Sequence, residues 1–221
     1  MSTNNIRSSW DDIPELISTT PFDIEMFSKY SHKESSILDI GCGYGRICKQ
    51  LEESGYKHIV GVDSSEILLK RASSSLIFTK LILSDALSMP LINEQFDVAI
   101  SFGVINCLTK KNDFEVYALE VDRLLKPGGY FLVNEFTRND SEYFEKKYSV
   151  GAEKYKLNRV FKSNTGLVYR HYSIAEILSV FDPYFDLVRC ERHDFLSLNH
   201  SRKVNGYSFV LQKLIYNSKF R

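Results

Sequence analysis

Three glycines alternate with other residues in one short stretch, at Gly41, Gly43 and Gly45, directly after an apolar segment. Glycine has no Cβ atom, so a ligand can approach the backbone closely at such positions. The helix expected at residues 46–54 would present free N–H groups and its positive dipole end, which suit a carboxylate. A dinucleotide fingerprint would require glycine where Arg46 stands, so the GxGxG spacing argues against a pyrophosphate ligand.

Two carboxylates follow at the ends of later apolar segments. Asp63 lies 22 residues after Gly41 and ends the segment at residues 58–63, where it could accept hydrogen bonds from both ribose hydroxyls of a nucleoside. Asp85 ends the segment at residues 80–85, where it could accept an amino hydrogen of adenine. A single glycine turn or a single aspartate is often only structural. Together, however, the three features have the order and the strand-end positions that a nucleoside site requires.

Short apolar segments that alternate with amphipathic ones position these residues. Strands are predicted at residues 37–41, 58–63, 80–85, 96–101 and 130–136, helices at residues 46–54, from Ser65, and at 113–125, and a turn at 126–129. Nearly all-apolar strands separated by helices indicate an α/β fold, a doubly wound parallel sheet covered on both faces. Since the carboxyl ends of parallel strands meet at one edge, the glycine turn and both aspartates are expected side by side there.

The remaining chain has a different character. We expect a single domain over residues 1–221, with an N-terminal helical cap at 1–36, the core at 37–136, a substrate lid insert at 137–172, and a C-terminal helix and strand pair at 173–221. Within the insert, residues 156–172 are typical of a β-hairpin with a glycine-containing turn. Ser173 and Glu176 form a capping-box pattern that predicts a helix start. Strands are predicted at 184–192 and 206–214, which would make the sheet mixed.

Composition excludes several classes of protein. The chain has 221 residues, 43% of them hydrophobic, and a formal net charge of zero, which argues against intrinsic disorder. No apolar run approaches the length of a membrane span, and the polar start lacks an apolar signal core, so we expect no membrane partner. Four scattered cysteines without a CxxC pair predict no metal site, no disulfide framework and a cytoplasmic location.

The charge is unevenly distributed. Lys and Arg number 13 against 19 Asp and Glu through Thr137, giving −6, and 15 against 9 from Arg138 onward, giving +6. A basic insert would suit an anionic small substrate, or a nucleic acid, although solvated faces explain the asymmetry equally well.

As a set, the segments ILDIGCGYGR, VGVDSS, SDALSMPLINEQFDVAIS, FGVINCL and LLKPGGYFLV resemble the class I S-adenosylmethionine-dependent methyltransferases. The resemblance covers about residues 37–133. It implies S-adenosylmethionine as cofactor and a seven-stranded Rossmann-like sheet whose last strand is antiparallel beside the fifth.

The resemblance also implies roles for individual residues. It places Asp39 and the turn Gly41–Cys42–Gly43 at the methionine part, Asp63 at the ribose with Ser64 also in the cofactor site, Asp85 and Ala86 at the adenine, and Phe102 and Gly103 at the methyl-bearing end.

The acceptor site is expected from the cap, the loop after the fourth strand and the insert. Its candidate residues are Trp10, Tyr30, Asn106, Tyr169, Arg170 and Tyr172. His171 is a candidate proton acceptor, and Arg170 could clamp a carboxylate or phosphate. On a strand, Tyr169 and His171 would share one face, with Arg170 and Tyr172 on the other. The alternative is that both tyrosines are core residues and that Arg170 and His171 are solvated.

Three functions fit this pattern. The first is an O- or N-methyltransferase for a small metabolite, and one bearing an anionic group would suit the basic insert. The second is an RNA-modifying methyltransferase, and the third is a catalytically silent cofactor-binding subunit. Zero net charge and the lack of an Arg/Lys-rich arm favour the first and disfavour nucleic acid as a partner. The sequence leaves both a monomer and a homodimer open.

Overall fold

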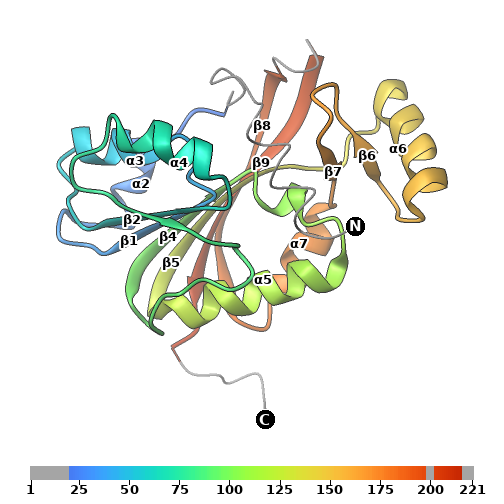
Figure 1. Ribbon diagram of the computed structural model, residues 1–221. Helices are drawn as coiled ribbons and strands as arrows, with labels where there is room; N and C mark the ends of the chain where they lie inside the picture. The colour runs from blue at the N-terminus through green and yellow to red at the C-terminus, as the bar shows by residue number, and fades with distance from the viewer. Residues whose placement is uncertain (1–19, 198–201, 216–221) are drawn as a thin grey trace.

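The computed structural model describes residues 20–197 and 202–215, and its main feature is a seven-stranded sheet in the order β3-β2-β1-β4-β5-β9-β8 (Figure 1). The strands are β1 (Ile37–Ile40), β2 (Ile59–Asp63), β3 (Lys80–Leu83), β4 (Phe96–Phe102), β5 (Leu125–Phe136), β6 (Val160–Lys162), β7 (Val168–Arg170), β8 (Phe185–Ser197) and β9 (Arg202–Lys213). The helices are α2 (Ile24–Phe27), α3 (Arg46–Glu53), α4 (Glu66–Ser73), η2 (Ile105–Cys107), α5 (Lys111–Leu124), α6 (Glu142–Tyr155) and α7 (Ile174–Phe181).

Strands β1 to β5 are parallel, as the alternating pattern predicted. Strand β1 is buried along its whole length, so it must be apolar on both faces. One face of the sheet packs on α5 and α7, through side chains such as Phe114 and Phe181. The other face packs on α2, α3 and α4, through Phe27, Leu51 and Leu69. The fold is therefore the doubly wound arrangement that the sequence predicted.

The last two strands complete the sheet in antiparallel fashion. Strand β9 lies between β5 and β8, with Phe136 opposite Gly206 and Tyr130 opposite Gln212. This confirms the expectation of an antiparallel strand beside the fifth. Residues 202–205 of β9 continue past the end of β5, so the β8–β9 hairpin extends beyond the carboxyl edge of the sheet (Figure 1).

Local chemistry fixes the starts of three helices. The Asp23 side chain accepts a hydrogen bond from the Met26 N–H at the start of α2, and Ser65 caps α4. The predicted capping box of α7 is present, with Ser173 and Glu176 bonded to each other's backbone N–H. Residues 126–129, which were predicted as a turn, lie instead in β5 at a break in its register with β4.

The insert contains a helix that the sequence pattern did not predict. Helix α6 precedes the expected hairpin, whose strands β6 and β7 pair antiparallel with Phe161 opposite Tyr169. Phe144 and Tyr148 of α6, Phe161 of β6 and Val204 of β9 form a small hydrophobic cluster separate from the two faces of the sheet. The insert thus has a core of its own and is joined to the projecting hairpin.

Candidate active site

The glycine turn and Asp63 are directly bonded at the carboxyl edge of the sheet. The Gly43 N–H donates to Asp63 Oδ2 and the Ser65 N–H donates to Asp63 Oδ1, both at 2.8 Å. The Gly41 and Cys42 N–H groups both donate to the Val62 carbonyl oxygen, at 2.8 and 3.0 Å. The turn after β1 is therefore held against the end of β2, and its carboxylate partner is fixed in orientation.

Two positions in the turn require glycine for different reasons. Gly41 has φ +69°, and a Cβ there would lie 2.5 Å from Val104 Cγ2, so the loop after β4 approaches its backbone closely. Gly43 has φ +56°, and within the described part of the chain the atom nearest to a Cβ there would be Leu68 Cδ1 at 4.0 Å. The space beside Gly43 is thus open, which fits a ligand lying against the backbone.

Asp39 lies beneath the turn. Its side chain is 2% exposed, and the Cys48 thiol donates to its Oδ2 at 3.2 Å. Burial raises the pKa of Asp39 to about 7. Cys42 is buried beside Cys48 in the same region, and burial contributes to a raised pKa of its thiol. Asp39 and Cys42 are thus buried beneath the turn and support it from below.

The residues predicted for the adenosine lie at the ends of β2 and β3. Asp85 is half-buried, and its Oδ1 accepts the Leu87 N–H at 3.0 Å, which fixes the carboxylate within its own turn. Ala86 and Ser64 are also half-buried. Because Asp63 pairs in register with Leu83, these two strand ends are adjacent, as a nucleoside site requires.

Phe102 and Gly103 end β4 next to the glycine turn. The Phe102 ring contacts Phe22 with ring centroids 5.8 Å apart, so it is part of the hydrophobic face beneath the edge. The Gly103 N–H donates to the Asn134 carbonyl oxygen at 2.9 Å. A Cβ at Gly103 would meet no atom of the described residues within 4 Å.

Glu135 is a residue of this site that our sequence reasoning missed. Its side chain is 1% exposed and accepts the Ile105 N–H at 2.8 Å and the Asn106 N–H at 3.3 Å. Burial raises its pKa to about 8, although bonds from the loop backbone oppose this shift. A glutamate at the end of the apolar run Tyr130–Val133 of β5 was the available signal. Glu135 holds the loop that follows β4.

One acceptor-site candidate, Asn106, belongs to this loop, and a second, Tyr169, lies near it. Asn106 is 3% exposed, and its Oδ1 accepts no hydrogen bond in the part of the chain that the structure describes. Tyr169 lies on β7, and burial, together with the nearby Cys107 and Glu135, raises the pKa of its phenol well above the usual range. The insert therefore brings Tyr169 to the loop after β4.

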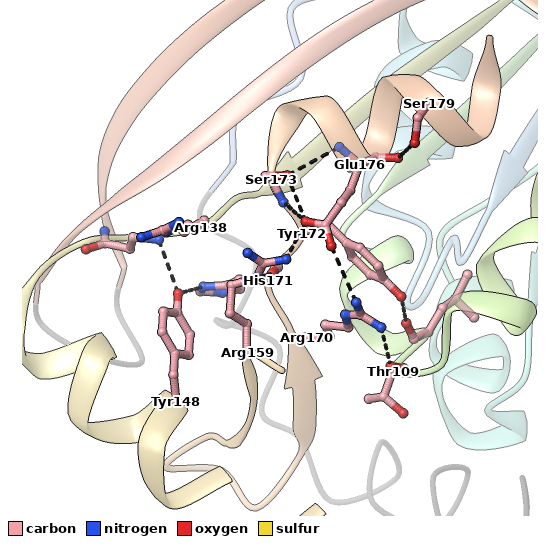
Figure 2. Close-up of polar contacts among 12 residues, drawn as sticks. Thr109, Arg138, Tyr148, Arg159, Arg170, His171, Tyr172, Ser173, Glu176 and Ser179 are labelled. Atoms are coloured by element: carbon pink, nitrogen blue, oxygen red, sulfur yellow. Dashed lines mark hydrogen bonds and ion pairs between the residues drawn. The ribbon is translucent and has the colours of Figure 1, made fainter. Parts of the chain in front are cut away.

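Arg170 and Tyr172 have structural roles that correct the prediction of substrate contacts. The Arg170 guanidinium donates to the Thr109 carbonyl oxygen at 3.1 Å, lies 3.5 Å from Glu176 Oε1 and covers the Tyr172 ring at 4.4 Å (Figure 2). The Tyr172 ring is 1% exposed, and its hydroxyl donates to the Leu108 carbonyl oxygen at 2.5 Å. Tyr172 is thus a core residue, as the alternative interpretation of the sequence expected. Arg170, which that interpretation expected to be solvated, is instead bonded to other residues of the protein.

His171 is likewise buried in the insert, which corrects its prediction as a proton acceptor. It is 5% exposed, its Nδ1 is 2.7 Å from the Tyr148 hydroxyl, and its ring lies 4.7 Å from the Phe161 ring (Figure 2). His171 and Tyr169 both contact Phe161, so the predicted sharing of one face is confirmed. The side chain faces the aromatic cluster of the insert, formed by Phe144, Tyr148 and Phe161.

The N-terminal candidates have different outcomes. The Tyr30 ring lies 5.1 Å from Tyr130, which is paired with Val98 near the amino-terminal end of β4. Tyr30 therefore lies near the amino-terminal ends of the strands, away from the carboxyl edge. Its assignment to the acceptor site is wrong. Trp10 lies outside the described residues.

Comparison with known proteins agrees with this geometry. Residues 38–133 match a family model described as a methyltransferase domain. The structure is similar to that of an S-adenosylmethionine-dependent methyltransferase from Methanosarcina mazei, with a TM-score of 0.80 and 22% identity over 86% of this chain and 98% of that one. Residues 38–133 therefore form a methyltransferase domain, and the described structure has the Rossmann-like fold of the class I S-adenosylmethionine-dependent methyltransferases.

Two further methyltransferases are similar. A ubiquinone/menaquinone biosynthesis C-methyltransferase of Campylobacter jejuni is 27% identical over 160 residues, which are 69% of this chain and 65% of that protein. The chain thus matches just under two thirds of that relative's length. A 1,6-didemethyltoxoflavin-N1-methyltransferase from Burkholderia thailandensis, solved with S-adenosylhomocysteine, has a TM-score of 0.61 and 16% identity over 82% of this chain and 72% of that one. Among the described residues of this methyltransferase, no helix is long and apolar enough to cross a membrane.

Proposed function

We propose that this methyltransferase transfers the methyl group of S-adenosylmethionine to a small, uncharged aromatic acceptor of hydroquinone type. The cofactor supplies, when bound, a methyl group on a positively charged sulfur. The observation that carries the proposal is the 2.8 Å bond between the Gly43 N–H and Asp63, because it places an open backbone turn and a nucleoside-type carboxylate at one edge.

The chain's own residues have distinct tasks in this proposal. The backbone of the turn Gly41–Gly43 binds the carboxylate of the methionine part, Asp63 accepts the ribose hydroxyls, and Asp85 accepts the adenine amino group. Each Asp63 oxygen accepts one backbone N–H and keeps a further lone pair, so the ribose hydroxyls can donate to the carboxylate without displacing Gly43 or Ser65. Positioning of the acceptor in line with the methyl group supplies most of the catalysis.

The acceptor is proposed from the loop after β4 and the insert. Asn106 and Tyr169 offer a carbonyl oxygen and a phenol, which suit the hydroxyls and ring of a hydroquinone. Arg170 is engaged by Thr109 and Glu176, so the proposal no longer includes a clamp for an anionic group. The name of the Campylobacter jejuni relative favours a ring carbon as the methylated atom. Methylation at oxygen or nitrogen, expected from the sequence, is the second candidate.

Product analysis tests the proposal. The full chain is incubated with S-adenosylmethionine carrying a deuterated methyl group and with 1,4-naphthohydroquinone, and the product is examined by mass spectrometry and NMR. We expect a label on a ring carbon. A methyl ether would support the oxygen alternative. Label in an RNA pool instead would favour the RNA-modifying alternative, and binding of the cofactor without any product would favour the silent subunit.

A further inference from the structure

The outward face of α6 combines basic and apolar side chains beside an open groove. The groove has a volume of about 430 Å3 and lies between α6 and β6. Four lysines surround it, together with aromatic rings and one valine: Lys146, Lys147, Lys154, Lys162, Tyr143, Tyr155, Phe161 and Val150. Among the residues that the structure describes, no carboxylate lines the groove. Figure 1 shows α6 at the periphery, separated from β4 and β5 by the β6–β7 hairpin.

Helix geometry explains why the basic residues gather there. Tyr143, Lys147, Val150 and Lys154 recur at intervals of four, three and four residues, so they form one stripe along α6. Gly151 packs against β6 so closely that a Cβ would overlap the Val160 carbonyl oxygen. This close approach places the stripe along the rim of the α6–β6 contact, where Lys147 also bonds to Asn164 of the hairpin.

The ammonium groups are held in position by the rings. Lys147 Nζ lies 5.0 Å from the Tyr143 ring centroid and 3.1 Å from Asn164 Oδ1, and Lys154 Nζ lies 5.4 Å from the Tyr155 ring centroid. Lys146 is paired with Glu142. In the described part of the chain, Lys154 and Lys162 form no ion pair. The groove therefore presents cations that lack a protein anion.

We propose that this face of α6 docks the enzyme on an anionic phospholipid bilayer, with phosphate headgroups at the groove and Val150 in the interface. Val150 is 67% exposed at the centre of the stripe, where a soluble anion would leave it in water. Lysines that flank an exposed apolar side chain are the pattern of a helix lying on an anionic surface. This goes beyond the proposed function and needs no spanning helix, whereas the sequence alone predicted no membrane partner.

Single-stranded nucleic acid fits the face less well. Binding of that kind uses aromatic faces on which bases stack. Here the Tyr143 and Tyr155 rings are covered by Lys147 and Lys154, and Phe161 is 2% exposed. The cationic groups are accessible, but the stacking surfaces are already occupied.

Vesicle sedimentation of the full chain tests the proposal without any acceptor, so its result is independent of methyl transfer. We expect binding to phosphatidylcholine vesicles that contain about 30% phosphatidylglycerol, and none to pure phosphatidylcholine. The triple variant Lys147→Ala/Lys154→Ala/Lys162→Ala should weaken the partition coefficient roughly 100-fold, because each lysine near the surface contributes about fivefold. Val150→Asp should weaken it as well, and Val150→Leu should not.

A matched control separates docking from general charge. The triple variant Lys49→Ala/Lys57→Ala/Lys70→Ala changes the net charge equally, but on and near α3 and α4, and should bind vesicles nearly as well as the original chain. Thermal unfolding monitored by circular dichroism verifies that each variant is folded. Equal loss in the control, equal binding to neutral vesicles, or tighter binding to an RNA oligonucleotide than to anionic vesicles would overturn the proposal.

Discussion

The parallel core and the lid insert hold their charged groups in different ways. In the core, residues 37–136, carboxylates accept backbone N–H groups at strand ends, as Asp63 does from Gly43 and Glu135 does from Ile105. In the insert, residues 137–172, charged groups bond to other side chains and to α7, as Arg159 does to Glu176. The strand order places a carboxylate that is bonded to the backbone, and such a carboxylate can still accept a ligand. Charged side chains that pair with one another, in contrast, stabilise the insert itself.

The largest effect should come from removing the carboxylate that joins the insert to α7. Glu176 accepts hydrogen bonds from Arg159, Ser173 and Arg170 (Figure 2). Glu176→Ala leaves the Arg159 and Arg170 guanidinium groups, 14% and 11% exposed, without their anion and removes the capping box of α7, so it should lower the free energy of unfolding by roughly 2–3 kcal/mol. Urea denaturation measures this loss. Glu142→Ala is the control, because the exposed pair with Lys146 should contribute less than about 1 kcal/mol. Equal effects of both variants would contradict the contrast between the two regions.

The next largest effect should be on the cofactor. Asp63→Ala removes the carboxylate that we assign to the ribose, and it should weaken S-adenosylhomocysteine binding by about 1–3 kcal/mol in calorimetry. Asp140→Ala, at an exposed carboxylate of the insert, is the control and should leave the affinity unchanged. Unchanged affinity in Asp63→Ala would refute the assignment.

The buried carboxyls of the core should also make stability depend on pH. The pKa of Glu135 is raised from 4.5 to about 8 on folding, so the folded state holds its proton more tightly than the unfolded state. Its contribution is complete below pH 4.5 and is lost as pH rises toward 8. Between these values Glu135→Gln should reduce the downward slope of the unfolding free energy by up to about 1.4 kcal/mol per pH unit. Chemical denaturation at a series of pH values measures the slope, and an unchanged slope would show that Glu135 does not titrate in this range.

The smallest effect on catalysis should come from Arg170. Because its guanidinium is bound to Thr109 and Glu176, Arg170→Lys should lower the free energy of unfolding by about 1 kcal/mol and leave the acceptor's KM unchanged. Steady-state kinetics at saturating cofactor provide the measurement. A raised KM with unchanged cofactor affinity would restore the anion clamp predicted from the sequence.

The contrast between the two regions also explains which features could be predicted from the sequence. The core was predictable because backbone topology places its site: Asp63 ends β2, Asp85 follows β3, and the carboxyl ends of these neighbouring parallel strands lie together. Helix α7 was predictable because Ser173 and Glu176 form a local capping motif. In each case the deciding interaction lies within a few residues or follows from strand order.

The insert was less predictable because its side chains are placed by long-range packing. His171 has a chemistry suited to proton transfer, but the Phe144 and Phe161 rings that surround it come from α6 and β6. Tyr30 precedes the core in sequence, yet it lies against Tyr130 near the amino-terminal ends of the strands, away from the carboxyl edge. Residue type indicates what a side chain could do, and only the packing shows what it faces.

The attachment of the loop after β4 to Glu135 has a consequence for how acceptor preference can change. One side chain on β5 holds the N–H groups of Ile105 and Asn106, so the loop backbone does not depend on the identity of its own side chains. Substitutions at Asn106 or Cys107 can therefore change the size and polarity of the side chains on this loop while these two N–H groups stay bound to Glu135. We expect libraries randomised at these two positions, with Glu135 retained, to yield folded enzymes with shifted substrate ranges.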